Sequence, residues 1–208
     1  MKQRRLSGLY LIIDQDQLRN RLPEKVTAEA LEAGVRNIQY RAKGLSKREA
    51  YEAAVRIRDV CHGKDAVFII NDRTDLALAV NADGVHLGQE DLPVDKARKI
   101  LGPGSVIGVS VHTVMQAQEA EKTGADYLGV GPVFPSQTKQ ARPPLGCTFL
   151  REIRKSVNIP VAAIGGIKPG NVRDVLESGA EAYAVVSAVL SADDIAVAVT
   201  AFQAAGKK

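Results

Sequence analysis

Two aspartates, Asp72 and Asp91, each follow a short, mainly apolar run. The runs, residues 67–70 and 85–87, are typical of strands buried on both faces of a parallel sheet. Ligands bind beyond the carboxyl ends of such strands, so both carboxylates would face one space. Because magnesium is usually held by one or two carboxylates plus substrate phosphates, the pair predicts a Mg²⁺ site. The alternative is that each aspartate caps a helix, which either residue taken singly favours.

A polar triplet, Gln39, Arg41 and Lys43, follows another apolar run at a spacing of two residues. If the chain stays extended there, all three side chains project from one face. Near the carboxyl ends of the strands they would point at the same space as the aspartates. The alternative is an ordinary charged loop with its polar groups in water, and the triplet by itself favours that alternative.

Phosphate binding is predicted where the last two strands end. Gly165 and Gly166 follow the apolar residues 161–164, and Val186-Ser187 end the next apolar run. In barrels this region often binds phosphate through backbone N–H groups and a helix N-terminus, and glycine allows close approach. A tight turn that needs positive φ is the alternative for the two glycines.

The longest loop, residues 131–145, contains Ser136, Gln137, Thr138 and Lys139. Loops of this length usually bind ligands or cover sites. Two hydroxyls and an ammonium could close over an anion here. A mobile polar loop is the alternative interpretation.

These residues need a scaffold that brings several strand ends together. Apolar runs alternate with segments of helical period, and most expected helices end at a glycine or asparagine that leads directly into a strand. Eight such units in about 200 residues fit a closed (β/α)₈ barrel better than an open sheet. We expect an α/β fold with one domain, residues 1–208, in which residues 1–7 are a short lead-in. Expected strands are 9–13, 35–40, 67–70, 85–87, 106–109, 127–130, 161–164 and 182–186. Eight expected helices include one capped by Ser46 with Glu49, one opened by Pro93, and a last one at 192–202.

The composition excludes several classes of partner. The formal net charge is 28 − 24 = +4, an excess that favours small anionic ligands and does not by itself indicate nucleic acid. Aromatic residues make up 4% of the chain, which leaves few platforms for stacking single-stranded bases. The two cysteines lack zinc or disulfide spacing, and no long apolar stretch precedes Asp14. We therefore expect a cytoplasmic protein without a membrane span that acts on small phosphorylated molecules; a homo-oligomer is compatible with the sequence.

Eight short motifs carry a family resemblance. In order they are Q-Y-R-A-K, I-N-D, G-V-H-L-G-Q-E-D, G-V-S-V-H-T, G-V-G-P-V-F-P, T-K, A-I-G-G-I and V-V-S-A. Together they resemble the thiamine-phosphate synthase (thiamine-phosphate pyrophosphorylase) family over about residues 9–190. The resemblance implies a Mg²⁺-dependent (β/α)₈ transferase of thiamine biosynthesis. It would join hydroxymethylpyrimidine diphosphate to a thiazole phosphate, or its carboxylated form, giving thiamine phosphate and pyrophosphate. Relatives often carry an extra N-terminal helix over the barrel floor, whereas the expected lead-in here is only residues 1–7.

The resemblance also implies a role for each residue of the site. The pyrimidine diphosphate would be held by Gln39, Arg41, Lys43, Asn71, Ser110 and Lys139. Mg²⁺ would bind Asp72 and Asp91. The thiazole phosphate would be held by Ser136, Gln137, Thr138, Gly166, Val186 and Ser187. The catalytic residues, which stabilise the departing diphosphate, would be Arg41, Lys43 and Lys139. The family's usual T-x-T-K is S-Q-T-K here, which keeps the hydroxyl.

Two other functions fit the same scaffold. A thiazole tautomerase of similar sequence would isomerise the thiazole phosphate and would need no apparatus for a diphosphate. A catalytically silent sensor of phosphorylated metabolites would keep the phosphate cradle and contact a partner protein. The three histidines have no metal-ligand or triad spacing. We expect His86 to be a hydrogen-bonded barrel residue, His62 to be an exposed helix end, and His112 to face the barrel mouth.

Overall fold

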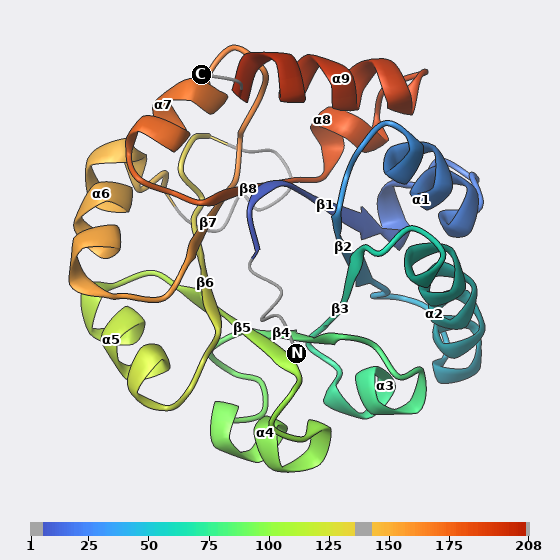
Figure 1. The fold of residues 1–208 in the computed structure, drawn as a ribbon, viewed down its shortest axis with the longest axis horizontal. Helices are drawn as coiled ribbons and strands as arrows, with labels where there is room; N and C mark the ends of the chain where they lie inside the picture. The colour runs from blue at the N-terminus through green and yellow to red at the C-terminus, as the bar shows by residue number, and fades with distance from the viewer. Residues whose placement is uncertain (1–5, 136–142, 207–208) are drawn as a thin grey trace.

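Eight parallel strands close into a barrel in the computed structural model, which describes residues 6–135 and 143–206. Each strand pairs with the next along the chain, and β8 pairs with β1 to close the sheet (Figure 1). The strands are β1 (Gly8–Asp14), β2 (Asn37–Arg41), β3 (Val67–Asn71), β4 (Gly84–Leu87), β5 (Val106–Val111), β6 (Tyr127–Val130), β7 (Val161–Ile164) and β8 (Ala182–Val185). The predicted (β/α)₈ barrel is confirmed.

Helices form a ring around the outside of the barrel (Figure 1). They are α1 (Pro23–Glu32), α2 (Lys47–His62), α3 (Thr74–Ala79), α4 (Val94–Leu101), α5 (Val114–Lys122), α6 (Gly146–Ser156), α7 (Val172–Glu177), α8 (Ser187–Leu190) and α9 (Ile195–Gly206), with a short 3₁₀ helix, η1 (Gln15–Gln17). The predicted capping box is confirmed, because Ser46 Oγ accepts the Glu49 N–H and the Glu49 side chain accepts the Ser46 N–H. None of the helices in the described part of the chain is both long and apolar enough to cross a bilayer.

The main difference from the expected elements is α8, a helix of four residues that follows β8 directly. The sequence predicted a strand as far as Val186 and a helix from residue 192, whereas the last long helix begins at Ile195. A single helical turn is too short to show a helical period of apolar residues, so the sequence pattern could not predict this helix. Pro93 is a smaller correction, since it is the N-cap of α4 and not its first helical residue.

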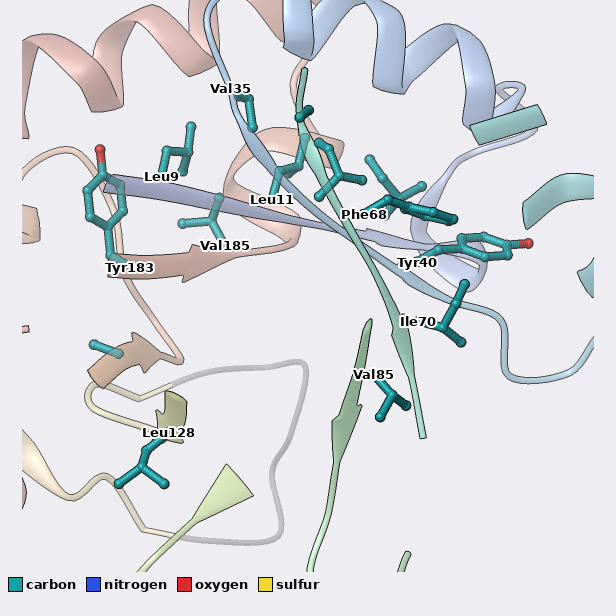
Figure 2. Close-up of a cluster of buried hydrophobic side chains, with 14 of the residues drawn as sticks. Leu9, Leu11, Val35, Tyr40, Phe68, Ile70, Val85, Leu128, Tyr183 and Val185 are labelled. Atoms are coloured by element: carbon teal, nitrogen blue, oxygen red, sulfur yellow. The ribbon is translucent and has the colours of Figure 1, made fainter. Parts of the chain in front are cut away.

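The core has two layers, because side chains alternate along each strand between the helices and the barrel interior. The outer layer packs between sheet and helices, and Figure 2 shows part of it, with Leu9, Leu11, Phe68 and Ile70. The inner layer contains the intervening residues of the same strands together with Leu6, which is only 4% exposed. Leu6 therefore fills part of the barrel interior from the lead-in segment that precedes β1.

Candidate functional site

Two carboxylates meet at the carboxyl ends of β3 and β4. The Asp72 carboxyl lies within hydrogen-bonding reach of Asp91. Asp72 follows β3 directly with a φ of 62°, which is uncommon for a residue with a side chain and costs free energy. Such strained residues cluster at functional sites. The predicted approach of the two aspartates is thus present in the structure.

The charges around Asp72 are poorly balanced. Burial raises the pKa of the Asp72 carboxyl above its ordinary value, and the negative charge of Asp91 raises this pKa further. Lys43 opposes the shift, with its Nζ 3.4 Å from Asp72 Oδ2. Asp91 is fixed by its own loop, because its Oδ2 accepts the Gly88 N–H at 2.6 Å. A divalent cation between the two carboxylates would relieve this repulsion.

This donor set fits Mg²⁺. Across the described residues, no group of three or more His, Cys, Asp or Glu side chains gathers as a metal site. Two carboxylates are the set that magnesium completes with waters and substrate phosphates, whereas a structural zinc site needs four protein ligands. The alternative that the aspartates cap helices is wrong, since the N-caps of α3 and α4 are Arg73 and Pro93.

The triplet on β2 is divided between two environments. Gln39 is 2% exposed, and its Nε2 donates to the Tyr10 hydroxyl at 2.8 Å inside the barrel. Arg41, the last residue of β2, forms an ion pair of 2.8 Å with the buried Asp14 at the end of β1. Lys43 lies past the strand, so the expectation that all three residues share one strand face is wrong. Both cations nevertheless lie at or just past the carboxyl end of β2, where each pairs with a carboxylate.

Asn71 and Ser110 lie near the carboxyl ends of β3 and β5, the two strands that pair with β4. Asn71 is the last residue of β3 and is half-buried. Ser110 Oγ lies 2.9 Å from His86 Nε2, and His86 Nδ1 lies 2.9 Å from the Tyr127 hydroxyl. The expectation of a hydrogen-bonded His86 is confirmed. The sequence interpretation missed Tyr127. The signal that could have found it is the pair of strand glycines, Gly108 and Gly129, which leave room for large side chains inside the barrel.

The other two histidines lie at the ends of secondary-structure elements. His62 is the last residue of α2 and is exposed, as expected. His112 directly follows β5, is half-buried, and its Nδ1 lies 3.0 Å from the Gly131 carbonyl oxygen.

The glycine pair after β7 is a turn with positive φ, 97° at Gly165 and 65° at Gly166. The alternative interpretation, a tight turn that needs positive φ, is therefore confirmed for the backbone of these glycines. A Cβ on Gly166 would lie 2.5 Å from the Pro135 carbonyl oxygen. Phe134 also donates its N–H to the Gly165 carbonyl at 3.0 Å. The turn is thus packed against the start of the loop that follows β6.

Four predicted site residues of that loop, Ser136, Gln137, Thr138 and Lys139, lie outside the described residues. Pro135, which contacts the Gly166 turn, is the last described residue before them. Their predicted roles stay predictions.

The other predicted phosphate residues begin α8. Val186 is the N-cap of this short helix and Ser187 its first residue, with no side-chain hydrogen bond to the cap within the described structure. The far end of α8 is held by Arg21, which donates to the Leu190 carbonyl and, at 3.2 Å, to the Ala192 carbonyl. A short extra helix after the last strand is a common phosphate site in barrels, because its first N–H groups have no partner within the helix.

Comparison with known proteins agrees with this architecture. The family model for thiamine monophosphate synthase matches residues 9–189. A thiamine-phosphate synthase from Methanospirillum hungatei is 50% identical over 192 residues, covering 92% of this chain and 93% of that protein. A second, from Shouchella clausii, is 46% identical over 198 residues and covers 95% of each chain.

Solved structures give the same result. A thiamine phosphate pyrophosphorylase from Pyrococcus furiosus superimposes with a TM-score of 0.86 at 43% identity, covering 95% of this chain and 94% of the other. A 3-hexulose-6-phosphate synthase, at a TM-score of 0.73 and 20% identity, shares only the fold. With matches across nearly its whole length, this chain belongs to the thiamine monophosphate synthase family.

Proposed function

We propose that this protein is a thiamine-phosphate synthase, which joins hydroxymethylpyrimidine diphosphate to thiazole phosphate and releases pyrophosphate. The carboxylated form of the thiazole would in addition lose carbon dioxide. The observation that carries the proposal is the cluster of charges at the ends of β1 to β4. In it Arg41 pairs with Asp14, and Lys43 pairs with Asp72, whose carboxyl interacts with Asp91. A thiazole tautomerase or a sensor has no use for this cluster, because neither handles a departing diphosphate.

The two aspartates would hold Mg²⁺. When bound, the ion would neutralise negative charge on the diphosphate and so stabilise it as a leaving group. Arg41 would contribute N–H donors to the same oxygens. Its guanidinium is held on one side by Asp14 at 2.8 Å, and its planar fork leaves further donors free to bind an anion. Lys43 is 59% exposed, so its ammonium is within reach of a ligand in the mouth.

The reaction needs no covalent nucleophile from the protein. The bond between the pyrimidine methylene carbon and the diphosphate oxygen would break, with its electron pair leaving on the diphosphate. The thiazole nitrogen would then attack the methylene carbon. Positioning and stabilisation of the departing charge would supply the catalysis. Lys139 would add to that charge stabilisation, while Gln39, Asn71 and Ser110 orient the pyrimidine.

The thiazole phosphate would be bound on the opposite side of the mouth. Gly166, Val186 and Ser187 would offer backbone N–H groups to it, and Ser136, Gln137 and Thr138 would complete the contact. Support comes from the positive-φ turn at Gly166 and from the start of α8 at Ser187. Backbone donors at such positions are well suited to phosphate oxygens.

The test is to supply purified protein with both substrates and Mg²⁺. We expect thiamine phosphate and pyrophosphate in equal amounts, and neither product when one substrate or the metal is omitted. Isomerisation of the thiazole phosphate alone, without pyrophosphate, would reassign the protein as a tautomerase. Binding of the thiazole phosphate without any turnover would favour a sensor.

A further inference from the structure

A chain of hydrogen bonds crosses the interior of the barrel between two of the proposed substrate residues. It begins at Gln39, whose Nε2 donates to the Tyr10 hydroxyl at 2.8 Å. The Tyr10 and Tyr127 hydroxyl oxygens are 2.9 Å apart. From Tyr127 the chain continues through His86 Nδ1 and Nε2 to Ser110 Oγ, with each contact 2.9 Å long. The inner core of this barrel is therefore not wholly apolar.

The strands are built to make room for this chain. In register, His86 on β4 is opposite Gly108 on β5, and Gly108 is opposite Tyr127 on β6. A Cβ on Gly108 would lie 2.1 Å from the Tyr127 ring and 2.5 Å from His86 Nδ1. A Cβ on Gly129 would lie 2.8 Å from His86 Cε1. Glycine weakens a strand, and the space that these two residues leave is filled by the ring pair.

Only one direction of these hydrogen bonds gives each buried hydroxyl hydrogen a partner. An amide nitrogen donates and does not accept, so the Tyr10 oxygen accepts from Gln39. Burial raises the pKa of both tyrosine hydroxyls, so each keeps its single hydrogen at neutral pH. The Tyr127 oxygen is the acceptor available to the Tyr10 hydrogen, and the Tyr127 hydrogen then goes to His86 Nδ1. In the reverse direction the buried Tyr10 hydrogen would have no acceptor among the contacts of the described residues. Nδ1 then accepts, and the ring hydrogen is on Nε2.

This direction decides what Ser110 can do. The Nε2–H of His86 donates to Ser110 Oγ. The serine oxygen therefore accepts from the histidine, and its own hydrogen is left to donate to another group. With the other tautomer the serine would donate inward, and only its lone pairs would face a ligand. The histidine tautomer is thus set by the group bound to the other ring nitrogen.

We propose that Tyr127 is a positioning residue that holds His86 in its Nε2–H tautomer, which leaves the Ser110 hydroxyl to donate to an acceptor atom of the pyrimidine diphosphate. The identity of that ligand rests on the proposed function; the tautomer does not. Tyr10 acts one step earlier, because the hydrogen bonds from Gln39 through Tyr10 direct the Tyr127 hydrogen toward His86. Removal of either hydroxyl should therefore weaken the preference of His86 for Nε2–H.

The first measurement is the tautomer of His86, read from the ¹⁵N shifts of labelled histidine in the ligand-free protein. Only three histidines are present, and His86→Gln identifies the signals of His86. We expect Nε2–H for His86. His112 is an internal reference, because its Nδ1 lies 3.0 Å from the Gly131 carbonyl, which can only accept and so requires Nδ1–H. Nδ1–H at His86 of the wild-type protein overturns the proposal without any variant.

The second measurement uses Tyr127→Phe, with Tyr183→Phe as the matched control. The Tyr183 hydroxyl donates to the Phe202 carbonyl at 3.3 Å, outside the barrel. Tyr127→Phe should shift His86 away from pure Nε2–H and lower kcat/KM for the pyrimidine diphosphate by about tenfold, as expected when one hydrogen bond is lost. The KM for thiazole phosphate should not change. Tyr10→Phe should also weaken the preference for Nε2–H, because the hydrogen bond that directs the Tyr127 hydrogen is lost, and Tyr183→Phe should match the wild type.

Each outcome decides a separate point. If Tyr127→Phe keeps both the tautomer and the kinetics of Tyr183→Phe, Tyr127 only fills space and the proposal is overturned. If Tyr127→Phe does not fold, as shown by circular dichroism, the wild-type tautomer decides. If the wild-type protein forms no thiamine phosphate, the proposed function fails, while the ¹⁵N measurement still tells whether Tyr127 sets the tautomer.

Discussion

The two sides of the barrel mouth differ in the groups that they present. The carboxylate side, after β2 to β4, consists of charged side chains, namely Arg41, Lys43, Asp72 and Asp91. The glycine side, after β7 and β8, consists of backbone, namely Gly165, Gly166, Val186 and Ser187. Charge that develops on a leaving group is best stabilised by full charges or a metal ion held in place, whereas a phosphate that only anchors its substrate can be held by backbone N–H dipoles.

The two sides also differ in the type of residue that adopts a positive φ. Asp72 adopts a φ of 62° despite its side chain, and Gly166 adopts 65° without one. Strain is therefore accepted on the carboxylate side, where a specific carboxylate is needed, and avoided on the glycine side. It follows that the carboxylate side should be disabled by removing a charge, and the glycine side by adding a methyl group.

The largest effect should come from Asp91→Asn. The amide oxygen can still accept the Gly88 N–H, so the loop is kept while one proposed metal ligand loses its charge. We expect pyrophosphate release at saturating substrates to fall by about 10³-fold, as loss of several kcal/mol of metal stabilisation implies, with little change in Tm. Asp95→Asn, an exposed aspartate paired with Lys96, is the control. An unchanged Mg²⁺ dependence in Asp91→Asn would remove the metal from the carboxylate side.

Lys139→Ala should have the next largest effect. Lys139 is outside the described residues, and its role is implied by the family resemblance. Turnover should fall by about 10² to 10³, the usual cost of one preorganised electrostatic contact, while the KM for thiazole phosphate changes little. Lys168→Ala, at an exposed lysine beside the glycine turn, should leave turnover unaltered. A rise in the thiazole phosphate KM alone would place Lys139 on the glycine side instead.

Gly166→Ala tests the glycine side. The new Cβ would lie 2.5 Å from the Pro135 carbonyl oxygen, so the turn and the loop must separate. We expect the KM for thiazole phosphate to rise by about tenfold and the free energy of unfolding to fall by about 1–3 kcal/mol. Ser187→Ala keeps its backbone N–H and should change little. Gly170→Ala is the matched control, since a Cβ there meets nothing within 4 Å. A larger loss for Ser187→Ala than for Gly166→Ala would show that side chains do the binding here too.

The smallest effect should be the change in Tm caused by Asp72→Asn. It tests whether the Asp72 carboxylate stabilises the fold or only serves function. The folded pKa of Asp72 is raised, so the fold favours the protonated form, and that contribution is lost as pH rises through the folded pKa. Asparagine resembles the neutral form and tolerates positive φ. In EDTA near neutral pH, Asp72→Asn should therefore melt slightly higher than the wild type, and the difference should vanish in acid. A lower Tm near neutral pH that recovers in acid would mean that the Lys43 pair dominates.

Local pattern in the sequence determined the barrel and the places of many site residues. Short apolar runs, helix caps such as Ser46 and glycines at helix ends depend on residues a few positions apart, so they can be read along the chain. Because every parallel strand delivers its carboxyl end to one face, the joint placement of Asp72 and Asp91 also follows from order alone.

Tertiary structure alone decided which residues share the barrel interior. Tyr10 and Tyr127 are 117 residues apart, yet their hydroxyls are 2.9 Å apart. Gln39 donates a hydrogen bond to Tyr10 inside the barrel and does not share the environment of Arg41 and Lys43. Leu6 enters the same interior from the lead-in. These contacts depend on strand register around a closed sheet, where a shift of one residue would exchange inside for outside. That register is set by packing across the whole barrel, so no local stretch of sequence contains it.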